Sequence, residues 1–342
     1  MDDLEKTLNE LALAMQDHRE ALATKGARKP APTPHRKAAP NHAKSDARND
    51  ARNDARAALI ARLLVSIEAH AGLRVGEAIE ARLSAVLASV ELGELGKWVA
   101  GLDRLDRTHP DWLTLIESLT VNETFLFRDW AQLELLRTSG LASMIAAAGR
   151  GAHPSLRLWS AGCASGEEAY SLAVVALEAL VAAGAAKETA QEIELLAPWS
   201  LDVLGTDISR PVLIQARNGL YSTGSLSPFR AVPQPLLRFF PPAEGEQARS
   251  NRVVRSDVRR RVRFDHSNLM GRPPAGGGFD VVACRNVLVY FAPAARKIVQ
   301  AAIEAAVRRG GFLLLGPTDA PPDSARFETI WGPRAVIYRK RA

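Results

Sequence analysis

The chain has 342 residues, a formal net charge of +6 and an apolar fraction of 47%, which is ordinary for a globular protein. No apolar run approaches the roughly 20 residues that span a membrane, and the N-terminus lacks a signal-peptide core, so a soluble cytoplasmic protein without membrane insertion is expected. Cys163 and Cys284, the two cysteines, give neither a disulfide framework nor zinc spacing, and no metal site is predicted. The positive charge fits nucleic acid, an acidic protein partner, or an arginine-rich proteome.

The first 57 residues are expected to lie outside the folded domains. Residues 1–25 carry apolar side chains at helical spacing and predict an amphipathic helix. A docking helix for an unknown partner and a loosely formed terminal helix both remain open for it. Residues 26–57 are predicted to be a disordered linker, because prolines break its first part and an Asp-Ala-Arg-Asn repeat would stack like charges on a helix.

Residues 58–118 predict a helical N-terminal domain. Apolar residues recur there at helical spacing, and glycines and a His-Pro pair interrupt the pattern. We expect a small bundle of about four helices. Nothing in its sequence indicates chemistry.

One stretch combines a strand, a glycine turn and a helix. Leu156–Trp159 predicts a buried strand, and Glu167–Ala183 predicts an alanine-rich helix. Gly162 and Gly166 lie between them, where the backbone can turn sharply and a ligand can approach closely. Glu168 and the glutamate before it would repel a phosphate, so a nucleoside-like ligand such as S-adenosylmethionine fits better. A turn without a ligand is the competing interpretation.

Further short apolar runs predict the other strands of an α/β sheet: Leu201–Gly205, Val262–Phe264, Phe279–Ala283 and Phe312–Leu315. Asp207 follows the first of these runs, and an Asp at the tip of the second strand of such a sheet can accept hydrogen bonds from both ribose hydroxyls. Ligands in open α/β sheets bind beyond the carboxyl ends of the strands. The polar motifs described next fall at such ends, which indicates one common site.

Six motifs follow one another along the chain: Asn122-Glu123-Thr124 with Phe127-Arg128-Asp129, the stretch WSAGCASGEEAYS at 159–171, Gly205–Ser209, Ala216–Tyr221, Asn268-Leu269, and Cys284–Phe291. Taken alone, the first is better explained as a capped helix start, with Asn122 or Thr124 as the cap and the aromatic residues in the core. Taken together, the motifs resemble those of the chemotaxis receptor methyltransferases, the CheR family. The resemblance covers roughly residues 58–342.

The resemblance implies a Rossmann-like, doubly wound methyltransferase sheet over residues 119–342, with a small β-subdomain inserted at 221–261 and a helical domain before it. It also implies S-adenosylmethionine as the cofactor. The glycine turn contributes Gly162 to the candidate cofactor site, and the resemblance adds the remaining residues: Asn122, Thr124, Arg128, Glu168, Asp207, Asn268, Leu269, Arg285 and Asn286.

The reaction implied is methyl transfer to glutamate side chains of a chemoreceptor, and the implied partner is the receptor's cytoplasmic domain. A solvated glutamate has a pKa of about 4.3 and is already ionised at neutral pH, so no strong base is required. Arg128 is expected to anchor the substrate carboxylate and Tyr290 to stand near the transferred methyl group. The arginine-rich run at 249–263 is either a basic strand that pairs with an acidic receptor surface or a solvated edge strand.

Two other function classes compete with this interpretation. A catalytically silent module would bind the cofactor or the receptor without turnover. A nucleic-acid methyltransferase would explain the positive charge, but the fourth strand ends in Cys-Arg-Asn rather than in the N/D-P-P-Y/F motif of adenine methylation. Neither cysteine follows a proline, as the nucleophile of cytosine methylation usually does. A nucleic-acid partner is therefore not expected.

Overall fold

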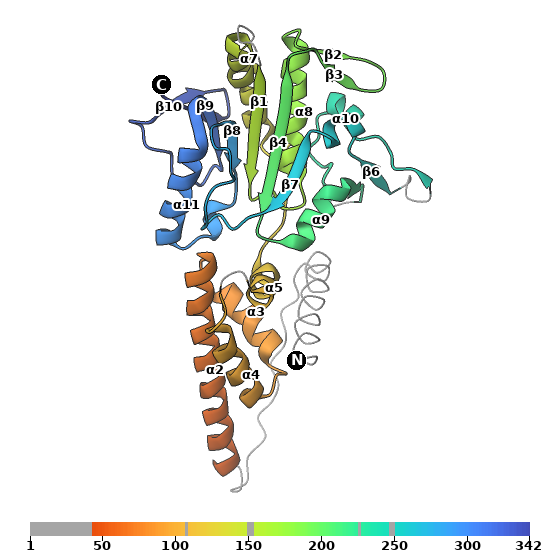
Figure 1. Cartoon of the computed structure of the whole chain (residues 1–342). Helices are drawn as coiled ribbons and strands as arrows, with labels where there is room; N and C mark the ends of the chain where they lie inside the picture. The colour runs from red at the N-terminus through yellow and green to blue at the C-terminus, as the bar shows by residue number, and fades with distance from the viewer. Residues whose placement is uncertain (1–42, 107–108, 149–153, 225–226, 246–249) are drawn as a thin grey trace. The chain divides into compact units, whose positions relative to one another are not determined.

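A computed structural model describes residues 43–106, 109–148, 154–224, 227–245 and 250–342. The chain forms two compact units, Met1–Thr120 and Val121–Ala342 (Figure 1). Among the described residues, none of the helices combines the length and the apolar character needed to cross a membrane. The amphipathic helix predicted over residues 1–25 and the first part of the predicted linker, 26–42, lie outside the described residues.

The first unit is helical, with α2 (Ala43–Ala71), α3 (Glu77–Leu87), α4 (Leu92–Leu102) and α5 (Pro110–Leu119). The periodic apolar residues of these helices form its core, where Ile67, Leu95 and Trp112 have no exposed surface. The indole nitrogen of Trp112 donates a hydrogen bond of 2.9 Å to the carbonyl of Leu102. This bond and the apolar packing hold α5 against the end of α4.

Helix α2 begins earlier than the sequence predicts. Its residues 43–57 were expected to be part of a disordered linker, but they are helical. Like-charge stacking costs only a few tenths of a kcal/mol per pair on a helix, and contacts with α3 and α4 outweigh it. Arg56 donates to the carbonyls of Leu87 and, at 2.7 Å, Val90, and so satisfies carbonyl groups at the end of α3. Arg52 forms an ion pair of 3.4 Å with Glu91.

The second unit is built on a seven-stranded sheet in the order β10-β11-β9-β8-β1-β4-β7. Pairing is parallel from β9 to β7, and β11 is antiparallel to both of its neighbours. From β1 the chain adds strands in one direction, β4 and then β7, and afterwards in the other, β8 and then β9. This reversal confirms the predicted Rossmann-like sheet. The strands are β1 (Ser155–Ala161), β4 (Ser200–Asp207), β7 (Val262–His266), β8 (Phe279–Cys284), β9 (Val307–Leu315), β10 (Phe327–Trp331) and β11 (Val336–Lys340).

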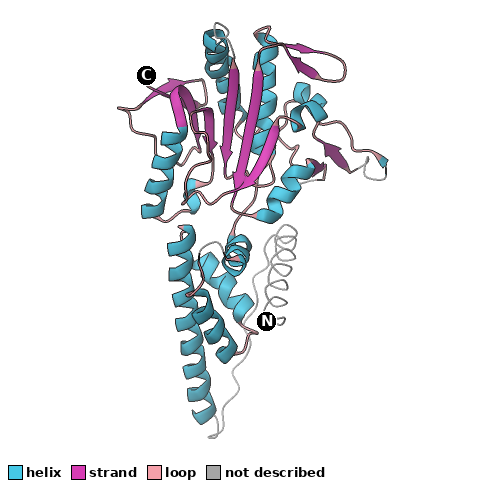
Figure 2. Ribbon diagram, viewed as in Figure 1, coloured by secondary structure: helices cyan, strands magenta, loops and turns pink. Residues whose placement is uncertain are grey.

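Helices cover both faces of this sheet (Figure 2). Successive strand residues point to opposite faces, so Leu158 and Leu314 belong to one apolar cluster while Trp159 and Leu313 belong to the other. The first cluster includes residues of α6 (Trp130–Leu135), the π-helix η1 (Leu136–Leu141), α7 (Ala142–Ala148), α8 (Glu167–Ala182) and α9 (Arg210–Asn218), and of two short helices described below. The second includes residues of α11 (Pro293–Ala306) and of a short 3-10 helix at Leu288–Tyr290.

Two small elements interrupt the sheet topology. A hairpin of β2 (Ala186–Glu188) and β3 (Ile193–Leu195) lies between α8 and β4, and it accounts for the long connection before Asp207. The region predicted as a β-subdomain contains an antiparallel pair, β5 (Leu220–Ser222) with β6 (Asn251–Val253), the 3-10 helix η2 (Gln234–Phe239) and the short α10 (Ser256–Arg259).

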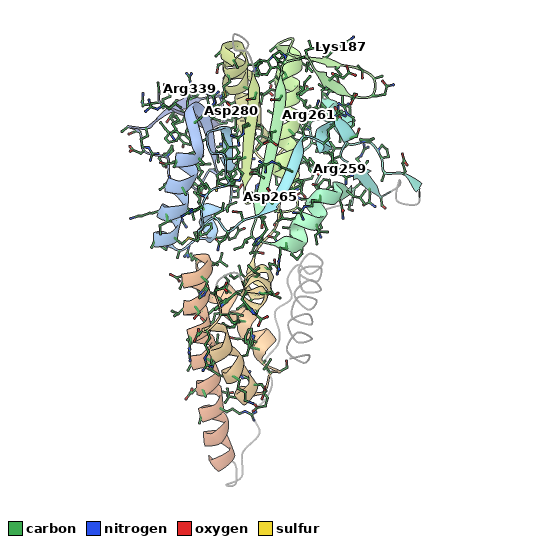
Figure 3. The ribbon with its side chains drawn as sticks, in the orientation of Figure 1. Lys187, Arg259, Arg261, Asp265, Asp280 and Arg339 are labelled. Carbon is green, nitrogen blue, oxygen red and sulfur yellow. The ribbon has the colours of Figure 1, made fainter. Side chains whose placement is uncertain are left out.

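The arginine-rich run does not form one basic strand, and that expectation is wrong. Arg252 lies on β6, Arg259 on α10 and Arg263 on β7. Several of its guanidinium groups bind other groups of the same chain. The side chain of Arg261, which follows α10, donates a hydrogen bond of 3.1 Å to the carbonyl of Ile193 (Figure 3). The ion pairs of this run include Arg255 with Asp257 at 2.6 Å, Arg260 with Glu192 at 2.6 Å, and Arg263 with Asp202 at 3.3 Å and with Asp265 at 3.0 Å. Much of this positive charge is therefore neutralised by the protein itself.

Candidate active site

The predicted site residues lie together along the edge of the sheet that is formed by the carboxyl ends of its parallel strands. The strand order reverses between β1 and β8, and open α/β sheets bind ligands beside that point. Strands β1 and β8 pair in parallel, with Ser160 opposite Ala283. Figure 3 shows Asp265 near this edge on β7, whereas Asp280 at the start of β8 lies at the opposite edge.

The glycine turn after β1 is folded tightly against its neighbours. Gly162 has a φ of +82°, and a Cβ there would lie 2.6 Å from Cγ2 of Val287. Gly166 has a φ of +95°, and its Cβ would lie 2.8 Å from that of Ala216. The amide nitrogen of Gly162 donates to the carbonyl of Thr206 at 2.8 Å, which joins the turn to β4. Both positions therefore require glycine, for conformation and for space.

Asp207 at the end of β4 is held by the backbone on both of its oxygens. The amide nitrogen of Ala164 in the glycine turn donates to Oδ2 at 2.8 Å, and that of Ser209 donates to Oδ1 at 2.9 Å. The residue is only 8% exposed, and burial raises the pKa of its carboxyl, although these hydrogen bonds act in the opposite direction. The side chain is thus fixed beside the turn, with lone pairs left over for a ligand.

Arg285, directly after β8, joins three segments through its buried guanidinium group. Its Nη1 donates to Glu168 at 3.2 Å, and its Nη2 donates to Asp129 at 3.1 Å and to the carbonyl of Arg128. The hydroxyl of Ser160 donates to the other oxygen of Glu168 at 2.7 Å. Burial raises the pKa of Glu168, and the charge of Arg285 opposes that change. This network fixes α8, the end of β8 and the segment before α6 relative to one another.

The segment before α6 is an irregular turn rather than a capped helix start. Helix α6 begins at Trp130, so the alternative with Asn122 or Thr124 as the cap is wrong. The amide nitrogen of Phe127 donates to the hydroxyl of Ser171 on α8 at 2.8 Å. Asn122 and Thr124 lie partly buried at the start of this segment.

The side chain of Arg128 makes its described contacts within this segment. Its guanidinium carbon is 5.6 Å from the centroid of the Phe125 ring, and its Nη1 donates to the carbonyl of Glu123 at 3.5 Å. Only its carbonyl is engaged by Arg285. The side chain is therefore positioned by local contacts and is half-buried.

Backbone strain is concentrated at this site. In the described residues, positive φ outside glycine occurs at Phe127 (54°), Asp129 (52°), Ala164 (47°) and Asn286 (59°), all within the segments just described. Residues held in this region cost about 1–3 kcal/mol each and typically mark functional sites. Nε of Arg285 and Oδ1 of Asn286 are also buried without a hydrogen-bond partner in the described structure. Strain and unsatisfied polar atoms together indicate a ligand site.

The remaining predicted residues lie around this centre. The amide nitrogen of Ser267 donates to the carbonyl of Asp207 at 2.9 Å, which brings the Asn268-Leu269 turn next to that aspartate. Leu269 packs against the apolar cluster that contains Trp159. Tyr290 lies on the 3-10 helix η4 (Leu288–Tyr290) and is 39% exposed. In the described part of the chain, no hydrogen bond of Arg285 reaches Tyr290.

Three contributors to this centre are not among the residues predicted from the sequence. Asp129 and Ser160 bind the residues that the motifs single out, and both stand inside those motifs, which was the available signal. Glu167 is 3% exposed, and burial raises its pKa from 4.5 to about 7, although the hydroxyl of Ser165 donates to it at 2.8 Å. The sequence places Glu167 beside Glu168 in the first turn of the helix, but no local pattern shows that its side chain is buried there.

Comparison with known proteins agrees with this geometry. The family model described as "CheR methyltransferase, SAM binding domain" matches residues 122–336. The chemotaxis protein methyltransferase of Vibrio parahaemolyticus is 30% identical over 80% of this chain and 93% of its own length. Chemotaxis protein methyltransferase 1 of Pseudomonas aeruginosa is 32% identical over 66% of this chain and 77% of its own.

Among solved structures, magnesium protoporphyrin IX methyltransferase from Synechocystis with bound S-adenosylmethionine is 19% identical to this chain. The match covers 61% of this chain and 79% of that one. Its TM-score of 0.31 is too low to bear on function. The family match extends from Asn122 to Val336 and thus over all the predicted site residues. The chain belongs to the CheR methyltransferase family, and its cofactor is S-adenosylmethionine.

Proposed function

We propose that this chain methylates glutamate side chains in the cytoplasmic domain of a chemoreceptor and forms glutamate methyl esters. Membership of a family of chemotaxis methyltransferases supports the reaction class and the pathway. The observation that carries the proposal is the Arg285 network, because it joins predicted cofactor residues to the backbone of Arg128, the predicted anchor of the substrate.

The residues at this edge fit S-adenosylmethionine. Asp207 is fixed by two amide groups and retains lone pairs that suit the ribose hydroxyls. Glu168 and Glu167 place carboxyl groups beside the glycine turn, and in their ionised form these favour a cationic ligand and disfavour a phosphate. The unpaired polar atoms of Arg285 and Asn286 supply a donor and an acceptor for it.

When bound, S-adenosylmethionine supplies a methyl group that a carboxylate oxygen takes as the carbon–sulfur bond breaks, which leaves S-adenosylhomocysteine and a neutral ester. The protein needs no general base for this, because the accepting carboxylate is already ionised at neutral pH. Its own residues therefore position the reactants and exclude water. Arg128 would orient the carboxylate from the segment before α6, and Tyr290 would border the same space from η4.

The test combines cofactor binding with methyl transfer. Binding of S-adenosylmethionine is measured by calorimetry for the wild type, Asp207→Ala and the control Asp202→Ala, which removes a partly exposed carboxylate from the same strand. Transfer of a labelled methyl group to receptor-rich membranes is measured in parallel. We expect a base-labile protein label that is lost with Asp207→Ala and kept with Asp202→Ala. Cofactor binding without any label would overturn the proposal and favour a silent module.

A further inference from the structure

A second arginine stands next to the predicted substrate anchor, outside the Arg285 network. The guanidinium carbon of Arg230 lies 3.9 Å from the centroid of the Phe125 ring. Its Nη2 forms an ion pair of 3.2 Å with Oε1 of Glu123. The Glu123 side chain is 79% exposed and that of Arg230 is 32% exposed. The Phe125 ring therefore contacts the guanidinium group of Arg230, and that of Arg128 lies farther from the same ring.

The turn that bears Arg230 is fastened to the segment that bears Arg128. The amide nitrogen of Leu126 donates to the carbonyl of Pro228 at 3.0 Å, and the amide nitrogen of Arg230 closes a turn onto the carbonyl of Ser227 at 3.1 Å. The charge of Arg230 also acts on Glu167 in the first turn of α8. Arg230 is thus placed by backbone contacts beside the residues that border the cofactor site.

We propose that Arg230 binds a carboxylate of the acidic substrate, and that Glu123 occupies the place of that carboxylate until the substrate arrives. This inference rests on the proposed function. The ligand chemistry is a carboxylate, either the one to be methylated or one beside it on the receptor.

Exchange of one carboxylate for the other costs the protein little. An exposed ion pair contributes little to stability, and most of the Glu123 side chain is already in water. The guanidinium group keeps its contact with Phe125 while its acidic partner changes, because cation–π stacking and ion pairing use different parts of an arginine. Arg230 therefore remains oriented during the exchange.

The same exchange would help the product leave if the bound carboxylate is the one that reacts. Methylation turns that carboxylate into an uncharged ester, which no longer attracts a guanidinium group. Glu123 keeps its charge and regains Arg230. The internal pair thus competes weakly with the charged substrate and strongly with the neutral product.

The experiment measures kcat and KM for methylation of a purified cytoplasmic chemoreceptor fragment by the wild type, Arg230→Gln and Glu123→Gln. Arg230→Gln removes the charge that recognises the substrate and should therefore raise KM about tenfold. Glu123→Gln removes the carboxylate that competes with the substrate for Arg230 and should therefore lower KM about twofold. The affinity for S-adenosylmethionine should stay as in the wild type for both. If the pair merely fastened the segment, both variants would change KM in the same direction, and that result would overturn the inference.

Arg238→Gln is the matched control. Arg238 also stacks on a phenylalanine, with its guanidinium carbon 4.5 Å from the Phe239 centroid, and its side chain is 35% exposed. Its charge is directed to Glu178 and Glu188, so KM should not change. If the wild type methylates the fragment and Arg230→Gln has the same KM as Arg238→Gln, the inference is overturned but the proposed function is not. A wild type that neither binds nor methylates the fragment would overturn the proposed function and the inference together.

A fragment whose accepting glutamates are replaced by glutamine identifies the carboxylate. Its binding is measured by fluorescence anisotropy with the wild type and with Arg230→Gln. A lower affinity of Arg230→Gln for this fragment assigns Arg230 to a neighbouring carboxylate. If the two proteins bind it equally but differ for the glutamate form, Arg230 binds the carboxylate that is methylated. Equal binding of both fragment forms by both proteins would contradict the inference.

Discussion

The two ends of strand β8 each hold a buried contact between an acidic residue and arginine, and the two contacts are built differently. At the amino end, Asp280 accepts from the amide nitrogen of Arg157 at 2.7 Å and pairs with Arg308, whose side chain is 43% exposed (Figure 3). At the carboxyl end, Arg285 is 2% exposed, one of its nitrogens has no partner in the described structure, and strained residues flank it. Burial of an ion pair alone therefore does not indicate function, whereas burial with strain and unsatisfied atoms does.

The largest effect is expected from breaking the carboxyl-end contact. Arg285→Met leaves Glu168 buried without its guanidinium partner, which should lower the free energy of unfolding by about 3–5 kcal/mol. The double variant Arg285→Met with Glu168→Gln removes the buried charge and should regain most of this loss, but it should not regain cofactor affinity. Urea unfolding and calorimetry with S-adenosylmethionine measure the two quantities. Recovery of both in the double variant would show that the network serves stability only.

The next largest effect concerns pH at the same edge. Burial raises the pKa of Glu167 to about 7, whereas its ordinary value is 4.5. Below that ordinary value both states are protonated. As the pH rises to about 7, the unfolded chain releases a proton that the folded chain keeps, so the free energy of unfolding falls. Above the raised pKa of Glu167, the free energy of unfolding is lower by the full amount of about 3 kcal/mol.

Glu167→Gln cannot ionise and should therefore be more stable than the wild type at pH 8 and show a flatter pH dependence. Urea unfolding at pH 5 and pH 8 provides the measurement, with Glu194→Gln on β3 as an exposed control. An unchanged slope in Glu167→Gln would contradict the shifted pKa.

A smaller effect is expected at the amino end of β8. Asp280→Asn keeps the shape of the side chain but removes its charge, so the hydrogen bonds to Arg157 and Arg308 weaken. The guanidinium group of Arg308 is partly in water and remains solvated, so the free energy of unfolding should fall by only about 2 kcal/mol. Cofactor affinity, measured by calorimetry, should match that of the wild type. A large loss of affinity would remove the distinction between the two ends.

The sequence was sufficient to predict the parallel part of the sheet. The β1 and β8 strands are short, predominantly apolar runs, interrupted near their starts by Arg157 and Asp280, and followed by glycine or polar motifs, which is typical of strands covered on both faces. Strands β10 and β11 were not predicted, because charged residues such as Glu328 and Arg339 alternate with the apolar ones on these partly exposed strands. The helical start of α2 was missed because it depends on contacts with residues more than thirty positions away.

For the site, the sequence predicted which residues gather but not how they are connected. The motifs placed Glu168, Asp207 and Arg285 at one edge of the sheet. The contact between Asp129 and Arg285 spans 156 positions and depends on a left-handed backbone at Asp129, which no local pattern specifies. The pairing of Arg230 with Glu123 likewise joins an inserted segment to a motif.

The smallest effect compares two glycines of positive φ in the second unit. Gly184 has a φ of +70° with nothing within 4 Å of an added Cβ, so Gly184→Ala should cost about 1 kcal/mol through the backbone alone. Gly162 has a similar φ of +82°, but its added Cβ would lie 2.6 Å from Cγ2 of Val287. Gly162→Ala should therefore cost about 1 kcal/mol more than Gly184→Ala.

Thermal or urea unfolding measures the stability difference, and calorimetry shows whether cofactor affinity falls with Gly162→Ala alone. Adding Val287→Ala removes the contacted methyl groups and should abolish the extra cost of Gly162→Ala, while the strain of positive φ remains. If affinity returns together with stability in this double variant, the cofactor depends on the path of the turn rather than on the absence of a side chain. If stability returns and affinity does not, the space at Gly162 is itself part of the cofactor site.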